Sequence, residues 1–82
     1  MERVEIERTI KKVFQNLFDV DPASITADAS PYNVEGWNSM QHLSLVTSLE
    51  AEFDVSFGDG QVVEMRTFGL IVKIVDDALR KR

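Results

Sequence analysis

Cysteine is absent from this sequence of 82 residues, and histidine occurs only once, as His42. Without cysteine the chain can form no disulfide and offers no thiolate to a metal or a substrate. A single histidine also excludes a histidine-rich metal centre and a catalytic site built on two histidines, so we expect no metal site. Any thiol chemistry must therefore arrive on a prosthetic group.

Long apolar runs are missing as well. No stretch approaches the roughly 18 apolar residues that a membrane-spanning helix needs. The opening residues, MERVE, lack the apolar segment of a signal peptide. We therefore expect no membrane span and a cytoplasmic location. The length predicts a single domain, residues 1–82, because a second hydrophobic core would have too few residues to fill it.

Basic residues are missing from the middle of the chain, since all 9 Lys and Arg lie within residues 3–12 and 66–82. The segment 13–65 carries acidic side chains and no basic ones, and the net charge of the chain is −5. Such a field repels phosphate backbones, so nucleic acid is not expected as a partner. Two interpretations of the acidic charge remain open: solubility alone, or attraction of basic surfaces on partner proteins.

Apolar residues at helical spacing predict two of the long helices. The first spans about residues 3–18 and ends before Pro22. The last follows Thr67, a suitable N-cap residue, and a short helical turn around residues 62–65 precedes it. The apolar face of the last helix is shared by Phe68, Ile71, Val72, Ile74, Val75, Ala78 and Leu79.

Another long helix is predicted to begin at Asn38-Ser39 and to run to about Phe53, because asparagine is a favourable N-cap residue. Its expected inner stripe is Leu43, Val46, Leu49 and Phe53. The fold class is therefore all-α, a small four-helix bundle with three long helices and one short one.

Two turn-rich segments connect these helices. Residues 19–38 form a long loop between the first two helices, with Ile25 and Tyr32 as its expected core anchors. The segment from Asp54 to Gly60 is expected to be an exit turn. A loop as long as 19–38 in so small a domain invites a functional explanation.

Ser39 is the candidate for chemistry, because a serine in the first turn of a helix presents its hydroxyl to solvent. The free N–H groups and the positive end of the helix dipole at that point can receive a phosphate. These physical signals leave two interpretations open, a phosphodiester attachment site or a residue that merely shares helix capping with Asn38.

The surrounding sequence resembles the acyl carrier protein family. The resemblance lies in the run GWNSMQHLSLV (36–46), continued by LEAEFDVSF (49–57), and extends over nearly the whole chain. In that family a serine carries 4′-phosphopantetheine, transferred from coenzyme A by a Mg²⁺-dependent phosphopantetheinyl transferase. The resemblance implies that Ser39 is the attached serine and that the cargo is an acyl or aminoacyl thioester.

The family motif at this site is Asp-Ser-Leu, and this chain departs from it at two positions. Asn38 replaces the aspartate before the serine, and Met40 replaces the leucine after it. Asparagine keeps the helix cap but loses the carboxylate, whereas methionine keeps an apolar side chain of similar volume. Slow modification by a standard transferase and an unmodified, carrier-like interaction domain therefore remain open as alternatives to the modified carrier.

The outer face of the helix after Asn38 is expected to bind partner enzymes. Counting about 100° per residue, Met40 lies off the core stripe. The other residues expected on this face are Gln41, Ser44, Thr47 and Ala51. This helix has fewer acidic side chains than the corresponding helix of many fatty-acid carriers, which predicts partners that depend little on charge. Trp37 either covers the helix entrance, which we favour, or offers a surface to the arm and its cargo.

A serine hydrolase is the remaining alternative, with Ser39 as nucleophile, His42 as base and Asp28 or Glu35 as its orienting acid. Helical geometry argues against it, because His42 should point inward as a partly buried, hydrogen-bonded side chain while Ser39 faces solvent. We therefore predict a monomeric carrier and not an enzyme. Its expected partners are the transferase, acyl-loading enzymes, and acyl-transfer or condensing enzymes.

Overall fold

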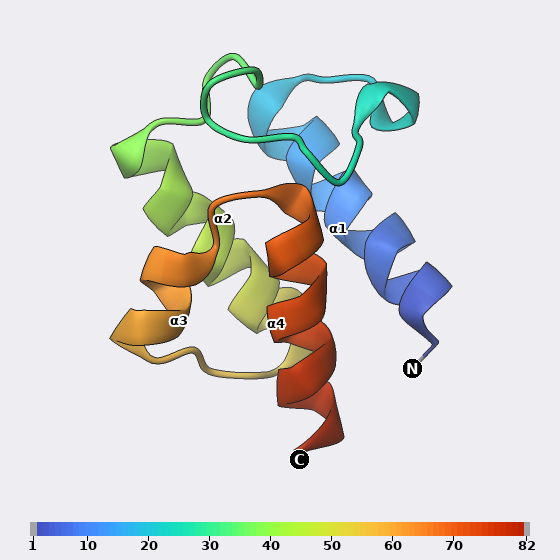
Figure 1. Cartoon of the computed structure of the whole chain (residues 1–82), viewed down its shortest axis with the longest axis vertical. Helices are drawn as coiled ribbons and strands as arrows, with labels where there is room; N and C mark the ends of the chain where they lie inside the picture. Colours follow the sequence, from blue (N-terminus) through green and yellow to red (C-terminus); the bar gives the residue numbers. More distant parts are fainter. Residues whose placement is uncertain (1, 82) are drawn as a thin grey trace.

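The computed structural model describes residues 2–81 and has the predicted all-α architecture (Figure 1). Its elements are α1 (Arg3–Phe18), a 3₁₀ turn η1 (Pro22–Ser24), α2 (Ser39–Phe53), α3 (Asp59–Glu64) and α4 (Phe68–Arg80). No strand occurs in the described range. The four-helix bundle with a long loop between α1 and α2 is thus confirmed. No helix among these residues has the length and apolar character needed to cross a membrane.

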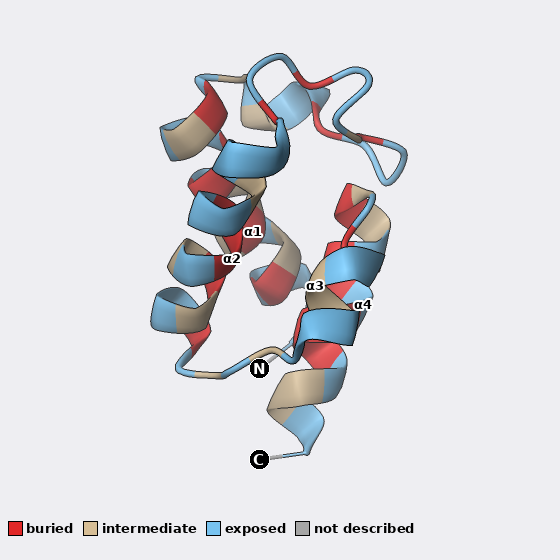
Figure 2. Cartoon of the chain, turned by 90° about the vertical axis from the view of Figure 1, so that its left-hand side faces the viewer, coloured by how far each residue is buried: buried red, intermediate tan, exposed pale blue. Residues whose placement is uncertain are grey.

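Helix α1 is the central element, because it packs against both α2 and α4, while α3 lies against α4. The buried faces of the helices point toward one another (Figure 2). The largest fully buried side chains are Ile6, Ile10 and Phe14 of α1, Leu45 and Leu49 of α2, Met65, and Ile71 and Val75 of α4. Burial of these apolar faces holds the helices together.

An aromatic cluster joins the loop to the helices around Phe14. Its ring packs edge to face against Phe18, Trp37 and Phe68, with centroid distances of 5.4, 5.2 and 5.6 Å. Edge-to-face geometry is the favoured arrangement of aromatic pairs at these separations. The cluster therefore ties the end of the long loop, through Trp37, to α1 and α4.

Within the long loop, the prediction for Ile25 is confirmed and that for Tyr32 is wrong. Ile25 is buried, but Tyr32 is 98% exposed. A turn explains the difference, because the N–H groups of Asn33 and Val34 both donate to the carbonyl of Ser30. This turn places Tyr32 at its tip and directs Val34 into the core.

The buried face of α2 is rotated relative to the prediction. Val46, Leu49 and Phe53 are buried as expected, but Leu43 is 64% exposed and Leu45 is completely buried. Leu45, Leu49 and Phe53 follow one another at four-residue spacing, which centres the buried face on Leu49 and turns Leu43 outward. The inclusion of Leu43 in the core was therefore wrong.

Helix α3 begins earlier than the sequence indicates. Asp59 and Gly60 belong to its first turn and not to the exit turn that was expected there. The side-chain oxygen of Gln61 accepts a hydrogen bond of 2.9 Å from the Gly58 N–H, which stabilises this start. The predicted N-caps of α2 and α4 are confirmed, since the side chains of Asn38 and Thr67 accept hydrogen bonds from the N–H groups of Gln41 and Leu70.

Candidate functional site

Local backbone geometry places Ser39 at the surface. Gly36 has a φ of 91°, in the left-handed region that glycine adopts most readily. The chain then turns Trp37 into the core, and Asn38 caps α2 through a hydrogen bond of 3.0 Å from the Gln41 N–H to Oδ1. Ser39 is the first residue of α2 and is exposed. The predicted position of its hydroxyl, in the first turn and open to solvent, is confirmed.

The environment of Ser39 suits an anionic ester. The first N–H groups of a helix have no intrahelical partner, and the positive end of the dipole of α2 lies there. One such site stabilises an exposed negative charge by about 0.3–1 kcal/mol. A phosphodiester on the Ser39 oxygen would lie within this favourable field, so the residues present fit that group.

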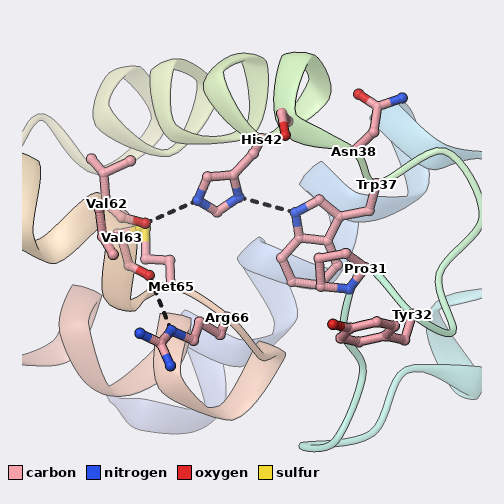
Figure 3. A pocket seen from close by; sticks show the side chains of 10 residues that line it. Pro31, Tyr32, Trp37, Asn38, His42, Val62, Val63, Met65 and Arg66 are labelled. Atoms are coloured by element: carbon pink, nitrogen blue, oxygen red, sulfur yellow. Dashed lines mark hydrogen bonds between the residues drawn. The ribbon is translucent and has the colours of Figure 1, made fainter.

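His42 lies one turn into α2 and is fully engaged (Figure 3). Its Nδ1 accepts a hydrogen bond of 3.0 Å from the indole N–H of Trp37, and its Nε2 lies 3.0 Å from the carbonyl oxygen of Val62. The imidazole is partly buried, as predicted. Because both ring nitrogens have partners, neither is free to take a proton from Ser39. The hydrolase alternative therefore lacks its base.

Trp37 covers the entrance of α2. Its side chain is 2% exposed and stacks on Phe18 with a centroid separation of 6.0 Å. This burial favours the covering role over a surface role, although one edge of the indole reaches the pocket described below. A direct contact between Trp37 and the arm stays a prediction.

The residues expected to contact partners share the solvent face of α2. Met40 is 81% exposed, and the side chains of Gln41, Ser44, Thr47 and Ala51 are exposed as well. Leu43 joins them, and its carbonyl accepts a hydrogen bond of 3.0 Å from the Thr47 hydroxyl. Sequence reasoning missed Leu43 on this face, although its three-residue spacing from Met40 was an available signal.

An open pocket of about 540 Å³ adjoins Ser39 (Figure 3). It lies where the long loop, the start of α2, and the segment from α3 to α4 meet. Its lining residues are Pro31, Tyr32, Trp37, Asn38, Ser39, His42, Val62, Val63, Met65 and Arg66. The sequence analysis named Trp37 and Asn38 as candidates but not the other loop residues, Pro31 and Tyr32, or the residues of α3. In the described range, no cluster of three or more acidic, histidine or cysteine side chains is suited to a metal ion.

Comparison with known proteins identifies the class to which this fold and site belong. A family model described as "Phosphopantetheine attachment site" matches residues 8–75. The acyl carrier protein of Phenylobacterium zucineum is 34% identical over 74 residues, which cover 90% of this chain and 92% of that protein. The acyl carrier protein of Caulobacter vibrioides is 33% identical over 72 residues, covering 88% and 91%.

Solved structures agree in fold. Holo acyl carrier protein from Geobacter metallireducens superimposes with a TM-score of 0.82 and 25% identity, covering 92% of this chain and 86% of that chain. The acyl carrier protein of Enterococcus faecalis gives a TM-score of 0.79 with 23% identity, covering 95% and 99%. The matched family is one of phosphopantetheine-attachment domains. This chain belongs to the acyl carrier protein family.

Family membership settles two of the general expectations. The protein is a carrier and not a catalyst, and covalently attached phosphopantetheine is the cofactor of its class. The resemblance read from residues 36–57 is thereby confirmed at the level of the family.

Proposed function

We propose that Ser39 carries the 4′-phosphopantetheine arm and that the arm holds an acyl or aminoacyl group as a thioester. The observation that carries this proposal is the position of Ser39 as the exposed first residue of α2, beside an open pocket. Two serines of the long loop are less suitable. The hydroxyl of Ser24 donates to the Asp21 carbonyl, and that of Ser30 accepts from the Tyr32 N–H, so both serve the loop.

In the attachment step, the Ser39 oxygen attacks the coenzyme A phosphorus that bears the pantetheine arm. The Ser39 O–P bond forms, the P–O bond to adenosine 3′,5′-bisphosphate breaks, and the hydroxyl proton is lost to a base of the transferase or to solvent. Ser39 has no general base of its own, because both ring nitrogens of His42 are engaged. The transferase must therefore supply the catalytic groups.

The loaded protein acts as an address and a tether, while partner enzymes supply the chemistry. We propose that its partners are a phosphopantetheinyl transferase, acyl-loading enzymes, and acyl-transfer or condensing enzymes in the cytoplasm. The arm keeps the thioester close to each docked enzyme, which raises its effective concentration there.

Partner enzymes should dock on the solvent face of α2 through apolar contacts and hydrogen bonds. Its first ten residues, 39–48, include no Asp, Glu, Lys or Arg, and Met40 and Leu43 are exposed among them. The two acids of α2 lie nearer its C-terminal end, and one of them, Glu50, accepts a hydrogen bond of 2.9 Å from the Phe57 N–H. We therefore expect docking that weakens little when salt is added.

The attachment is tested by incubating the apo protein with coenzyme A, Mg²⁺ and a broad-specificity phosphopantetheinyl transferase, and then measuring the intact mass. Wild type and the control Ser56→Ala, in the exposed segment between α2 and α3, should each gain one arm. Ser39→Ala should gain none while its circular dichroism spectrum stays helical. If wild type also gains none, the unmodified interaction domain becomes the better account.

A further inference from the structure

The side of α1 that faces solvent carries basic side chains. Helix α1 buries Ile6, Ile10 and Phe14 completely against its neighbours. Counting about 100° per residue, Arg8 lies opposite the centre of that buried face. The residues around it on the solvent side, here named the α1 basic stripe, are Val4, Arg8, Lys11, Lys12 and Gln15. The stripe contains three positive charges and no acidic residue.

These three charges have no ionic partner within the domain. The ion pairs among residues 2–81 all involve Asp76, whose partners are Arg3 and Arg80. The acids of α1 that flank the stripe, Glu5 and Glu7, pair with no basic residue either. Intramolecular ion pairing therefore does not account for the three charges of the stripe, and their N–H donors stay available to another molecule.

The charges of the stripe repeat along the helix axis. Lys12 lies four residues after Arg8 and Lys11 lies three after it, so neighbouring charges are about one helical turn apart. The ammonium of Lys11 lies over the Phe68 ring of α4, with Nζ 5.8 Å from the centroid. Cation–π attraction favours this position by about 0.5–1 kcal/mol at an exposed site. Carboxylates at one-turn spacing on a partner helix would match this arrangement.

The stripe suits a protein partner better than a membrane or a second copy of this chain. A basic helix binds lipid by inserting its apolar face, but the apolar face of α1 is buried and Val4 is its exposed large apolar side chain. A second copy would have to meet the stripe with a different surface, and such head-to-tail contacts build open chains. An acidic helix of another protein has the complementary charge and needs little apolar surface.

We propose that the α1 basic stripe docks an acidic helix of a partner protein, with carboxylates at one-turn spacing. The proposal is independent of the attachment at Ser39 and adds a second docking surface to the solvent face of α2. Both surfaces point away from the core that α1 and α2 share, so one partner can hold the carrier while another acts on its arm. The Debye length of about 8 Å at physiological ionic strength makes nearby charges outweigh the net charge of −5.

The test uses a synthetic helical peptide of alanine with glutamate at every fourth position. The control peptide has glutamine in place of each glutamate. Each is titrated into ¹⁵N-labelled protein at low ionic strength, where exposed charges are least screened. The protein variants are Arg8→Gln, Arg8→Lys and a matched control, Arg66→Gln, which removes an exposed arginine outside the stripe. Circular dichroism checks that each variant stays helical.

The glutamate peptide should bind wild type and shift the amide signals of α1, whereas the glutamine peptide should not bind. Arg8→Gln should weaken binding about three- to fivefold, the scale of one exposed ion pair. Arg8→Lys keeps the charge, so it should bind within about twofold of wild type, as should Arg66→Gln. Raising the salt to physiological ionic strength should weaken the complex, in contrast to docking on α2.

Four results would overturn the proposal. Absence of glutamate-peptide binding to wild type would remove the acidic helix as the occupant, and equal binding of both peptides would show that charge is not recognised. A loss in Arg66→Gln as large as in Arg8→Gln would report total charge and not the stripe. Binding to vesicles of phosphatidylserine and phosphatidylcholine that exceeds peptide binding and is lost in Arg8→Gln would assign the stripe to a membrane surface.

Discussion

The indole N–H of Trp37 donates a hydrogen bond of 3.0 Å to Nδ1 of His42, and the two rings are nearly parallel, at an interplanar angle of 17°. Because Nδ1 accepts, the proton of the neutral imidazole is assigned to Nε2, which donates to the Val62 carbonyl. This relay connects the end of the long loop to α2 and α3 beside Ser39. It holds the floor of the pocket in place.

Breaking the relay should destabilise the fold. His42→Phe keeps an aromatic ring but leaves the Trp37 N–H and the Val62 carbonyl without their partner. An unsatisfied buried group costs about 1–3 kcal/mol, so the free energy of unfolding in urea should fall by that amount. Gln41→Ala, an exposed change on the same turn, is the control. Equal unfolding midpoints for the two variants would show that the relay contributes nothing to stability.

Two leucines on α2 offer a matched test of its buried face. Leu45→Ala should lower the free energy of unfolding by about 2–5 kcal/mol, because it opens a cavity in the core. Leu43→Ala should lie within about 0.5 kcal/mol of wild type, as surface changes usually do. Thermal or urea unfolding measures both. A larger loss of unfolding free energy for Leu43→Ala than for Leu45→Ala would show that Leu43 lies in the core, as the sequence predicted.

These two leucines also show what local sequence can predict. The bounds of α2 and its cap were predictable, because Asn38 provides a side-chain acceptor where the apolar period begins. Its orientation was harder to predict, since Leu43 and Leu45 are equally apolar and the spacing of Leu43 from Met40 was the one local signal that Leu43 faces outward; packing against α1 decides which leucine is buried. The prediction that Tyr32 is a core anchor was wrong for a related reason. The hydrogen bonds of the turn after Ser30 determine the direction of this side chain.

Some features of the candidate site could likewise be predicted from the sequence, and others could not. Ser39 and the solvent face of α2 follow from short-range spacing on one helix. The pocket does not, because Tyr32 and Arg66 are brought together by the fold across more than thirty residues of chain. No local pattern marks Arg66 as a lining residue of this pocket.

Met40 should contribute to partner binding and little to stability. Met40→Ala should raise the KM of the transferase for the apo protein by about tenfold, the effect of losing one apolar anchor at an interface. Its unfolding midpoint should match that of wild type, because the side chain is 81% exposed. Val4→Ala, an exposed apolar change on α1, should leave the KM unchanged. If Met40→Ala instead unfolds the domain while its folded fraction is modified normally, Met40 belongs to the core.

Asn38 should limit the rate of modification without limiting stability. Asn38→Asp keeps an acceptor for the Gln41 N–H and restores the carboxylate of the family motif. We expect the rate of arm transfer to rise about two- to fivefold, the scale of one added exposed ion pair. Asn38→Ser, which keeps a cap but adds no charge, is the control. A rise in both variants would point to the cap, and a rise in neither would show that the transferase does not use this carboxylate.

The attachment of the arm at Ser39 in the cell is the central claim. Its most direct test is the mass of the protein purified from its native cells, measured intact and again on the peptide that contains residue 39. The account predicts one phosphopantetheine group on Ser39, with acyl species of higher mass when thioesters are preserved. Native protein with an unmodified Ser39, or with the arm on another serine, would contradict it.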